Sequence, residues 1–319
     1  MHDRPPYQPP WPVNLHPVGR YLFPVPEGLE FMGRSVWIND LFIEETDWRP
    51  GDRAQQFRDL WVPVRDEAKQ HYDLYKNRPI VRGGFAQEDV SELFGHQAVM
   101  LCYDGSGGGH WIDTFVAMPN FILRVKEDRF YEFGKECVDM EGTVLDFFRH
   151  YHTDRLNYPP DSFWTDRGWV QGMKTRNESV SAFAQRAKTE AAPEISLSFY
   201  AYMLSRPSDP PIKISSIRKV FEGNGINLKI LRSRERSFAG MPGLEEVYTG
   251  TMNEEGEIQT ELAAKWTIKE EPKNPDRPKI ILRMNCNARV QDEALRMWDS
   301  VLENFTSIRE WHARRRGGR

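Results

Sequence analysis

The order of features along this chain occurs twice, and this repeat constrains the fold more than any single motif. Each half starts with a glycine-anchored apolar segment, continues through amphipathic and alternating stretches to a glycine corner, and ends with a short aromatic-rich helix. The corners span residues 93–98 and 238–246, and the closing helices are expected at 141–151 and 292–309. A repeat of about 150 residues is the size of a domain and is too long for a solenoid unit. We therefore expect two similar lobes.

Composition narrows the classes of partner. The chain has 319 residues, 39% of them hydrophobic, and a formal net charge of -4. An acidic balance does not attract phosphate backbones, so nucleic acid is not expected as a partner. No stretch approaches the ~20 apolar residues that cross a bilayer, and the N-terminus lacks the apolar region of a signal peptide. The cysteines Cys102, Cys137 and Cys286 are too widely spaced for a zinc motif, and Cys102 and Cys286, which lie in apolar runs, are expected as buried thiols.

Apolar periodicity predicts several strands and a few helices. Residues 195–201 alternate apolar and polar side chains, which is typical of a half-buried strand. Residues 52–75 and 214–222 have helical spacing, and Asp292 is expected as the N-cap of the last helix. The further strands are expected at residues 18–26 at a sheet edge, then 98–103, 111–118, 121–125, 228–234, 244–249, 262–268 and 279–286.

The short turns between these strands favour antiparallel pairing, because parallel strands need long crossover connections. We therefore expect an α+β protein of two similar lobes, each a mainly antiparallel sheet with helices packed on one face, arranged like a clamp. The break near residues 157–161 indicates the boundary between the lobes. The expected domains are a proline-rich arm at 1–17, lobes at 18–156 and 161–311, and a basic tail at 312–319.

The glycine-rich segment 104–110 is the one stretch that invites a catalytic interpretation. It lies between two expected strands, contains no lysine and does not precede a helix, so it does not fit a phosphate-binding loop. It also lacks the spacing of a nucleophile elbow. The alternative to a hairpin tip is a hydrolase or small-ligand-binding enzyme that uses Ser106 with His96, His110 or His150. A metal site at His150 and His152 is not expected, because their spacing places them on different faces.

Acidic loops provide the second functional hypothesis. Carboxylates on loops stiffened by proline can meet basic groups of a protein partner, where charge complementarity guides encounter and specificity. We therefore expect a partner-binding surface at the hairpin tips and loops, formed by Asp104, His110, Asp209, Glu254, Glu255, Glu257, Glu270 and Glu271.

The motifs together resemble a known family. The segment 19–26, the Phe94-Gly95 corner, the segment 240–246 and the helix 293–299 ending at Ser307-Ile308-Arg309 are similar to the immunity proteins that neutralise phospholipase effectors of the bacterial type VI secretion system. The resemblance extends from Val18 to Arg309 and rests on the order of the motifs. Residues that match the family pattern, and for which we expect an architectural role, are Gly19, Gly95, Gly240, Pro242, Gly243, Glu245 and Trp298.

The resemblance implies a clamp-like protein without enzymatic activity or cofactor. Such a protein binds a cognate lipase toxin and blocks access to its active site or the movement of its lid, which protects the producing cell. The resemblance also implies a periplasmic location, whereas the missing export signal predicts a cytoplasmic one if the chain is complete. A third interpretation is an envelope scaffold that docks through the proline arm.

Overall fold

The computed structural model describes residues 10–75, 85–104, 110–129, 137–155, 158–171, 177–189, 192–203, 213–238, 240–254, 257–268 and 278–317. Contacts between residues divide the chain into two compact units. Unit 1 comprises residues 1–34, 160–164 and 178–319, and unit 2 comprises residues 35–159 and 165–177. All sheet pairings within the two units are antiparallel, so the protein is α+β with mainly antiparallel sheets. None of the described helices is long and apolar enough to cross a membrane.

Unit 2 is a sheet with the strand order β3-β4-β8-β7-β6-β5, into which β3 continues from unit 1. The expected hairpin of β6 and β7 is confirmed, with Asp104 paired to His110 at its end. Strands β9 and β11 form a separate short antiparallel pair. The elements are β3 (Glu30–Ile38), β4 (Leu41–Asp47), α1 (Arg53–Tyr75), β5 (Phe85–Asp89), α2 (Ser91–Phe94), β6 (Ala98–Asp104), β7 (His110–Ala117), β8 (Phe121–Arg129), α3 (Cys137–His150), β9 (Tyr151–His152) and β11 (Trp169–Val170).

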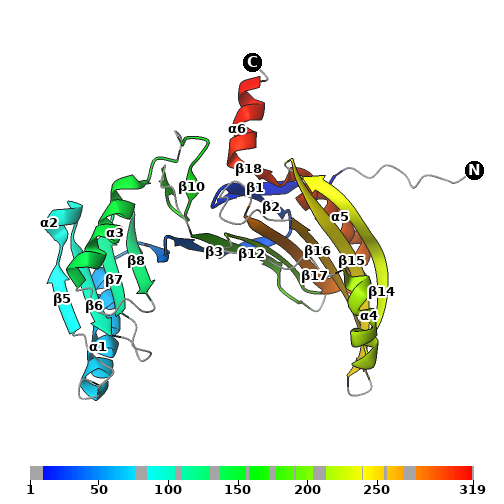
Figure 1. Ribbon diagram of the computed structural model, residues 1–319, viewed down its shortest axis with the longest axis horizontal. Helices are drawn as coiled ribbons and strands as arrows, with labels where there is room; N and C mark the ends of the chain where they lie inside the picture. Colours follow the sequence, from blue (N-terminus) through cyan, green and yellow to red (C-terminus); the bar gives the residue numbers. More distant parts are fainter. Residues whose placement is uncertain are drawn as a thin grey trace, which may run out of the picture. The chain divides into compact units, whose positions relative to one another are not determined.

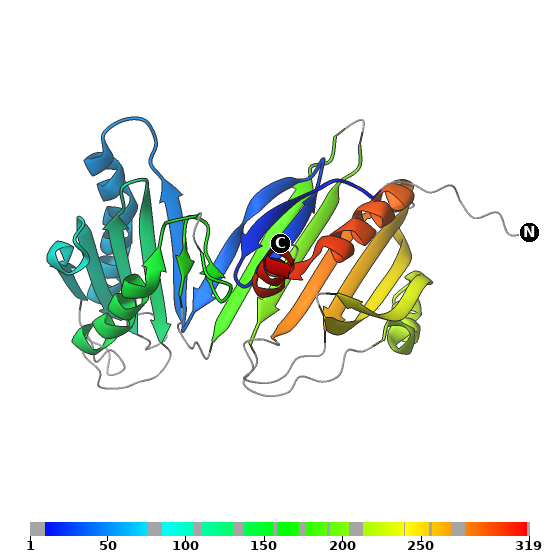
Figure 2. The same ribbon diagram turned by 90° about the horizontal axis from the view of Figure 1, so that it is seen from above.

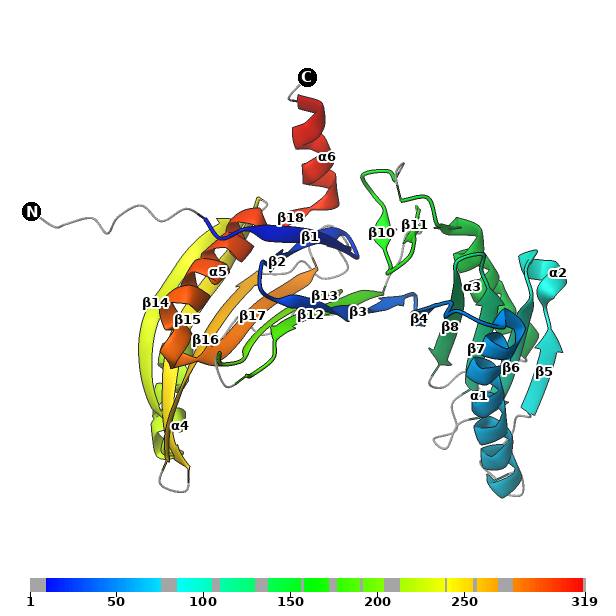
Figure 3. The same ribbon diagram turned by 180° about the vertical axis from the view of Figure 1, so that it is seen from behind.

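The helices of unit 2 cover both faces of its sheet. The Asp52 carboxylate accepts hydrogen bonds from the first backbone amides of α1, and α1 then packs on Ile122 of β8 through Phe57. The neighbouring residue Phe121 points to the other face, where its ring meets Tyr151, and Tyr151 in turn packs on α3. Figures 1 and 3, taken from opposite sides, show α3 in front in one view and α1 in front in the other. The expectation of helices on one face is therefore wrong for this unit, because β8 buries side chains on both of its faces.

Unit 1 is a sheet with the strand order β12-β13-β17-β16-β15-β14. Helix α5 lies over the strands of this sheet, as the view in Figure 2 shows. Helix α4 contacts the edge strand β14. The elements are β1 (Val13–Val18), β2 (Tyr21–Pro26), β10 (Phe163–Trp164), β12 (Glu178–Arg186), β13 (Ile195–Tyr202), α4 (Ile214–Gly223), β14 (Asn227–Phe238), β15 (Met241–Glu254), β16 (Glu257–Ile268), β17 (Lys279–Asn287), a 3-10 turn (Ala288–Val290), α5 (Gln291–Asn304), β18 (Thr306–Ser307) and α6 (Ile308–Gly317).

The two units have the same connectivity. In each, two strands precede a helix, four strands follow, and a helix ends the segment, apart from the extra short helix α2 in unit 2. The spatial order is also the same, because β4 lies next to β8 as β13 lies next to β17. Gly95 and Gly240 occupy equivalent corners, with positive φ angles of 65° and 67° that favour glycine. This is the arrangement that the repeated order of motifs indicates.

The N-terminal segment completes the core of unit 1. The expected edge strand 18–26 is instead the second half of a hairpin, in which β1 pairs with β2 around a turn at Gly19. Strand β2 lies between β1 and β18, and it tolerates its prolines because β18 covers only Tyr21 and Leu22. The Phe23 ring stacks on Phe199 of β13 at 5.6 Å. For this reason residues 1–34 belong to the same compact unit as the C-terminal part of the chain, and the compact units differ from the expected domains 18–156 and 161–311.

The C-terminal helix also differs from its expected form. The single helix expected at 292–309 is two helices, because Phe305 adopts an extended conformation and Thr306 pairs with Leu22. Asp292 lies in the first turn of α5 and is not its N-cap, which is Val290. Part of the expected basic tail belongs to α6, where Arg314 lies 3.8 Å from the Glu310 carboxylate.

Candidate functional site

The expected partner-binding residues group at two hairpins. The backbone of β6 and β7 places Asp104 opposite His110 in unit 2, and that of β15 and β16 places Glu254 opposite Glu257 in unit 1. The side chains of these four residues lie outside the described part of the structure. The other expected residues lie outside the described part with both backbone and side chain; they are Asp209, Glu255, Glu270 and Glu271. Their role in binding a partner therefore stays a prediction.

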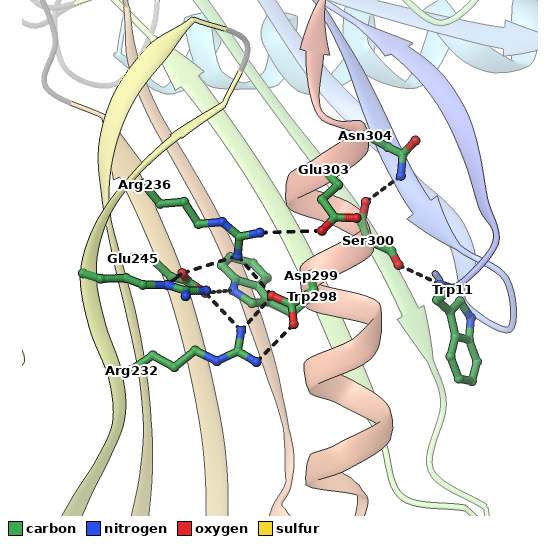
Figure 4. A network of polar contacts seen from close by, with 10 residues as sticks. Trp11, Arg232, Arg236, Glu245, Trp298, Asp299, Ser300, Glu303 and Asn304 are labelled. Atoms are coloured by element: carbon green, nitrogen blue, oxygen red, sulfur yellow. Dashed lines mark hydrogen bonds and ion pairs between the residues drawn. The ribbon is translucent and has the colours of Figure 1, made fainter. Parts of the chain in front are cut away.

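The most elaborate polar site of unit 1 is centred on Glu245, in the middle of β15 (Figure 4). Its side chain is fully buried between the sheet and α5. One carboxylate oxygen accepts a hydrogen bond from Arg234 Nε at 2.7 Å, and the other accepts one from Trp298 Nε1 at 3.1 Å. Arg232 and Arg236 of β14 also face this carboxylate. We call the set of Arg232, Arg234, Arg236, Glu245 and Asp299 the ion cluster.

Asp299 is the second carboxylate of the ion cluster and connects it to α5. Arg232 donates two hydrogen bonds to it, at 2.7 and 3.1 Å, and Arg236 donates a third at 3.1 Å. A two-pronged guanidinium contact of this kind fixes orientation as well as charge. The ion cluster therefore ties α5 to β14 and β15 through side-chain contacts.

The charges in the ion cluster stabilise one another. Burial opposes the ionisation of Glu245, but the hydrogen bond and charge of Arg234, with the charge of Arg236, outweigh it and hold the pKa of Glu245 below its usual range. Burial acts against the ionised form of Asp299 too, and Arg232 and Arg236 hold the pKa of Asp299 below its usual range. Both carboxylates are therefore ionised at neutral pH.

Adjacent residues of β15 serve opposite faces of the sheet. Glu245 points to α5, whereas Glu246, the next residue, accepts a hydrogen bond from the Ile214 backbone amide at 2.6 Å. Ile214 is the first residue of α4, and a carboxylate stabilises the positive end of a helix there. The Glu245-Glu246 pair therefore positions α5 on one face and α4 on the other, and for this unit too the expectation of helices on one face is wrong.

The glycines of the motif are required by close packing. A Cβ atom on Gly243 would lie 2.6 Å from the indole of Trp266, which is fully buried. A Cβ atom on Gly19 would lie 2.9 Å from Val180, and the φ angle of Gly19 is 56°. The structure thus buries Gly19, Glu245 and Trp298 in unit 1, while the half-buried Gly243 and the exposed Pro242 line a cavity of about 360 Å³.

Sequence reasoning missed the basic half of the ion cluster. Arg232, Arg234 and Arg236 alternate along β14, so their side chains lie on one face of this edge strand. The signal was a period-two run of arginines opposite a Glu-containing strand, in a stretch where we expected only the short strand 228–234. That strand continues to Phe238, which brings Arg236 into the sheet.

A second carboxylate site, centred on the half-buried Glu45 in unit 2, was also missed. Glu45 of β4 accepts hydrogen bonds from the Thr165 hydroxyl at 2.7 Å and from the backbone amides of Asp166 and Arg167 at 2.6 and 2.9 Å. The Tyr151 hydroxyl also donates to it. Burial and the Glu45 carboxylate raise the pKa of Tyr151, which keeps this hydroxyl a donor. Glu45 therefore holds the segment 165–168 against β4 and β9.

The described residues contain no group of three His, Cys, Asp or Glu side chains that could hold a metal ion. His150 ends α3 with its Nδ1 atom 2.8 Å from the Asp146 carbonyl oxygen, and His152 stacks on Trp169. The His96 ring packs edge-on against Phe148. Ser106 lies outside the described part of the chain, so the hydrolase alternative gains no geometry in its favour.

One segment of the chain matches a known protein family. Residues 165–309 match the family described as the Tle cognate immunity protein 4 C-terminal domain. A search among curated proteins gave no match.

Solved structures share the fold over most of the chain. The apo structure of the immunity protein TplEi of T6SS from Pseudomonas aeruginosa is 16% identical, with a TM-score of 0.65 over 93% of this chain and 97% of that one. TplEi in complex with an "L" peptide gives a TM-score of 0.64 at 16% identity, over 93% and 98% of the two chains. A chain from the crystal structure of the Tle4-Tli4 complex gives 0.65 at 16% identity, over 93% and 98%.

The matched segment contains the segment 240–246 and α5, which carry part of the resemblance in the sequence, and it also contains the ion cluster. The resemblance to immunity proteins of the type VI secretion system is thereby confirmed. Residues 165–309 of this chain are similar to the Tle cognate immunity protein 4 C-terminal domain.

Proposed function

We propose that this protein is an immunity protein that binds and inhibits a cognate lipolytic effector of the type VI secretion system. The observation that carries the proposal is the family match over residues 165–309. A fold shared over 93% of the chain with immunity proteins of that system, one of them from a complex with Tle4, supports it. The protein acts by occlusion, blocking access to the active site of the effector or the movement of its lid.

The design of unit 1 suits a binding protein. Three arginines, two carboxylates and an indole N–H hold α5 against the sheet, which presents a preformed surface and reduces the entropy lost on association. We infer that the hairpin ends of both units contact the effector, as in a clamp. The acidic pair Glu254 and Glu257 and the pair Asp104 and His110 then contribute mainly to encounter rate and specificity.

Inhibition of a purified lipase tests the proposal. The effector encoded beside this protein should lose its activity on phospholipid vesicles at an equimolar ratio of the two proteins, while a lipase from an unrelated source keeps its activity. Full lipase activity in the presence of a stoichiometric amount of folded protein would refute the proposal. Ester or phospholipid turnover by the protein alone would favour the hydrolase alternative.

Charge reversal tests the contact residues separately. The double variant Glu254→Lys and Glu257→Lys should slow association with the effector about tenfold or more at low salt, and less at high salt. The matched control is Glu88→Lys, which reverses an exposed charge on β5 of the other unit. Equal association rates for the double variant and the control would remove this hairpin from the contact surface.

A further inference from the structure

The sheet of unit 1 carries α5 on one face, and several side chains on its other face are exposed (Figure 2). Alternate residues of a strand point to opposite faces. The second face is formed by every second residue from Ser179 of β12, Ser196 of β13, Gln259 of β16 and Lys279 of β17. The residues between them are nearly all buried in the core. We call the residues of the second face on these four strands the open face.

Two cations lie directly opposite each other on the open face. Lys265 of β16 is paired with Arg283 of β17 in the register of the sheet. The Cβ atoms of such residues are about 4.5–5.5 Å apart, and like charges at these positions destabilise a sheet. Neither side chain forms an ion pair within the described part of the chain, and the Arg283 guanidinium lies 5.9 Å from the centre of the Tyr200 ring. An anion between the two cations would remove this cost.

The surrounding charges leave the pair positive. Glu246 of β15 lies opposite Lys265 on its other side, but its carboxylate is 5% exposed and accepts the hydrogen bond from the first amide of α4. Burial, with the charges of Arg283 and Lys279, lowers the pKa of Lys265 and outweighs the opposing effect of Glu246. Glu261 is the one anion among the described residues of the open face, and it lies four residues from Lys265, about 13 Å along β16.

The side chains beside this pair resemble those of a protein-binding surface. Phe183 and Tyr200 are 38% and 39% exposed, and across β12 and β13 they lie opposite Ser198 and Ser181. Rigid aromatic rings next to small hydroxyl groups supply contact area at a low cost in conformational entropy, and tyrosine and arginine are enriched at protein interfaces. Phosphate groups, in contrast, are often held by the backbone amides of a helix N-terminus, whereas the open face consists of strands. A carboxylate on a protein therefore fits the open face better than a phosphate group does.

We propose that the open face binds a carboxylate side chain of the protein partner between Lys265 and Arg283. The carboxylate of an aspartate or a glutamate accepts hydrogen bonds from both cations, and apolar groups next to it on the partner pack against Phe183 and Tyr200. The two cations repel each other in the free protein, and binding relieves this repulsion. The identity of the partner as a lipolytic effector rests on the proposed function, whereas the selection of a carboxylate rests on the open face alone.

Two variants test the site through effector binding, measured by isothermal titration calorimetry. Arg283→Gln should weaken binding about tenfold or more. Lys265→Met should weaken binding to a similar extent while the melting temperature stays equal or rises, because it removes the like-charge pair. A lower melting temperature together with unchanged binding would overturn the site and assign Lys265 a structural role. Lys229→Gln removes one positive charge from an exposed position of β14, so it is the matched control and should bind as the wild type does.

A second measurement is independent of the effector. The peptide acetyl-Glu-Gly-Glu-amide, used as the probe, should shift the amide resonances of Tyr200 and Lys265 in the wild type, but not in Arg283→Gln. The uncharged peptide acetyl-Gln-Gly-Gln-amide should shift neither resonance. The absence of shifts with the acidic peptide would overturn the site. Shifts with phosphatidylglycerol vesicles but not with the acidic peptide would also overturn it, because the anion would then be a lipid phosphate.

The two measurements separate this site from the proposed function. Equal affinity of the effector for the wild type, Arg283→Gln and Lys265→Met would overturn the site and leave the proposed function intact. A wild type that binds the acidic peptide but no lipase would instead reject the proposed function alone.

Discussion

The substitution Glu245→Gln removes one negative charge from the ion cluster and keeps the shape of the side chain. The wild-type carboxylate is fully buried and faces Arg232, Arg234 and Arg236. After the substitution these three arginines share only Asp299 as a carboxylate partner within the ion cluster, and the new amide N–H group can point at a guanidinium. We expect unit 1 to lose stability as a result.

The size of this loss in the free energy of unfolding depends on how well water reaches the three arginines. Removing one partner of a buried ion pair costs about 3–5 kcal/mol when the remaining charge is fully desolvated. Here the side chains of Arg232, Arg234 and Arg236 are 25%, 51% and 22% exposed, so solvent partly compensates the lost partner. We therefore expect a loss of about 2–3 kcal/mol in the free energy of unfolding of unit 1 at pH 7.

Hydrogen exchange of the peptide 241–254 measures this loss in unit 1 alone. A loss of about 2–3 kcal/mol makes exchange through global opening about 30- to 150-fold faster, since 1.4 kcal/mol corresponds to a factor of ten. The control Glu235→Gln removes a charge from an exposed side chain of β14 and should change the free energy by less than about 0.5 kcal/mol. Equal exchange rates in the two variants would refute the argument that the buried charge holds α5 in place.

The pH dependence gives a second readout of the same cluster. The pKa of Glu245 and that of Asp299 are lower in the folded protein than in the unfolded chain. Their contribution to stability is therefore complete above the unfolded pKa values of about 4, and it is lost as the pH falls through the lower, folded values. The difference between wild type and Glu245→Gln should shrink as the pH falls below about 4. A difference that persists unchanged in acid would mean that it comes from packing and not from charge.

Two other substitutions follow from the same reasoning about close contacts. Gly243→Ala should destabilise unit 1 by about 1–3 kcal/mol in a urea titration, because the new Cβ atom meets Trp266 at 2.6 Å. The control Gly223→Ala places a Cβ atom in open space and should have little effect in that titration. Glu45→Gln should increase hydrogen exchange and proteolytic cleavage in the segment 165–168, because the carboxylate accepts hydrogen bonds from two backbone amides there. Glu88→Gln, at an exposed position, is the control. Unchanged protection of the segment in Glu45→Gln would contradict the role assigned to Glu45.

Local patterns accounted for much of the secondary structure. The alternation at 195–201 predicted β13, and helical spacing predicted α1 and α4 almost to the residue. The strands β14, β15 and β16 proved several residues longer than expected, because their ends are polar and carry no apolar periodicity. Cross-strand hydrogen bonds stabilise these ends, and the sequence of one strand does not show which strand it pairs with.

The candidate site was only half visible in the sequence. Gly243, Glu245 and Trp298 belong to the motifs that carry the family resemblance, and the structure brings the three together around Trp266 and the ion cluster. Their partners Arg232 and Arg236 were missed, because an arginine on an edge strand is usually solvated and nothing in its own neighbourhood points to α5. Glu45 was missed for the same reason, since its hydrogen-bond donors are about 120 residues away along the chain.

By itself, the order of residues determined the class of fold, the repeated arrangement of strands and helices, and the family resemblance of the segment 165–309, because these depend on local periodicity and on motifs that follow one another. Only the tertiary structure decided which carboxylates are buried and which cations neutralise them, that helices cover both faces of each sheet, and that the hairpin 13–26 completes the core of unit 1. The reason is that burial and charge pairing arise between segments far apart in the chain. Their energies depend on distance in space and on exclusion of water, and neither quantity can be read from neighbouring residues.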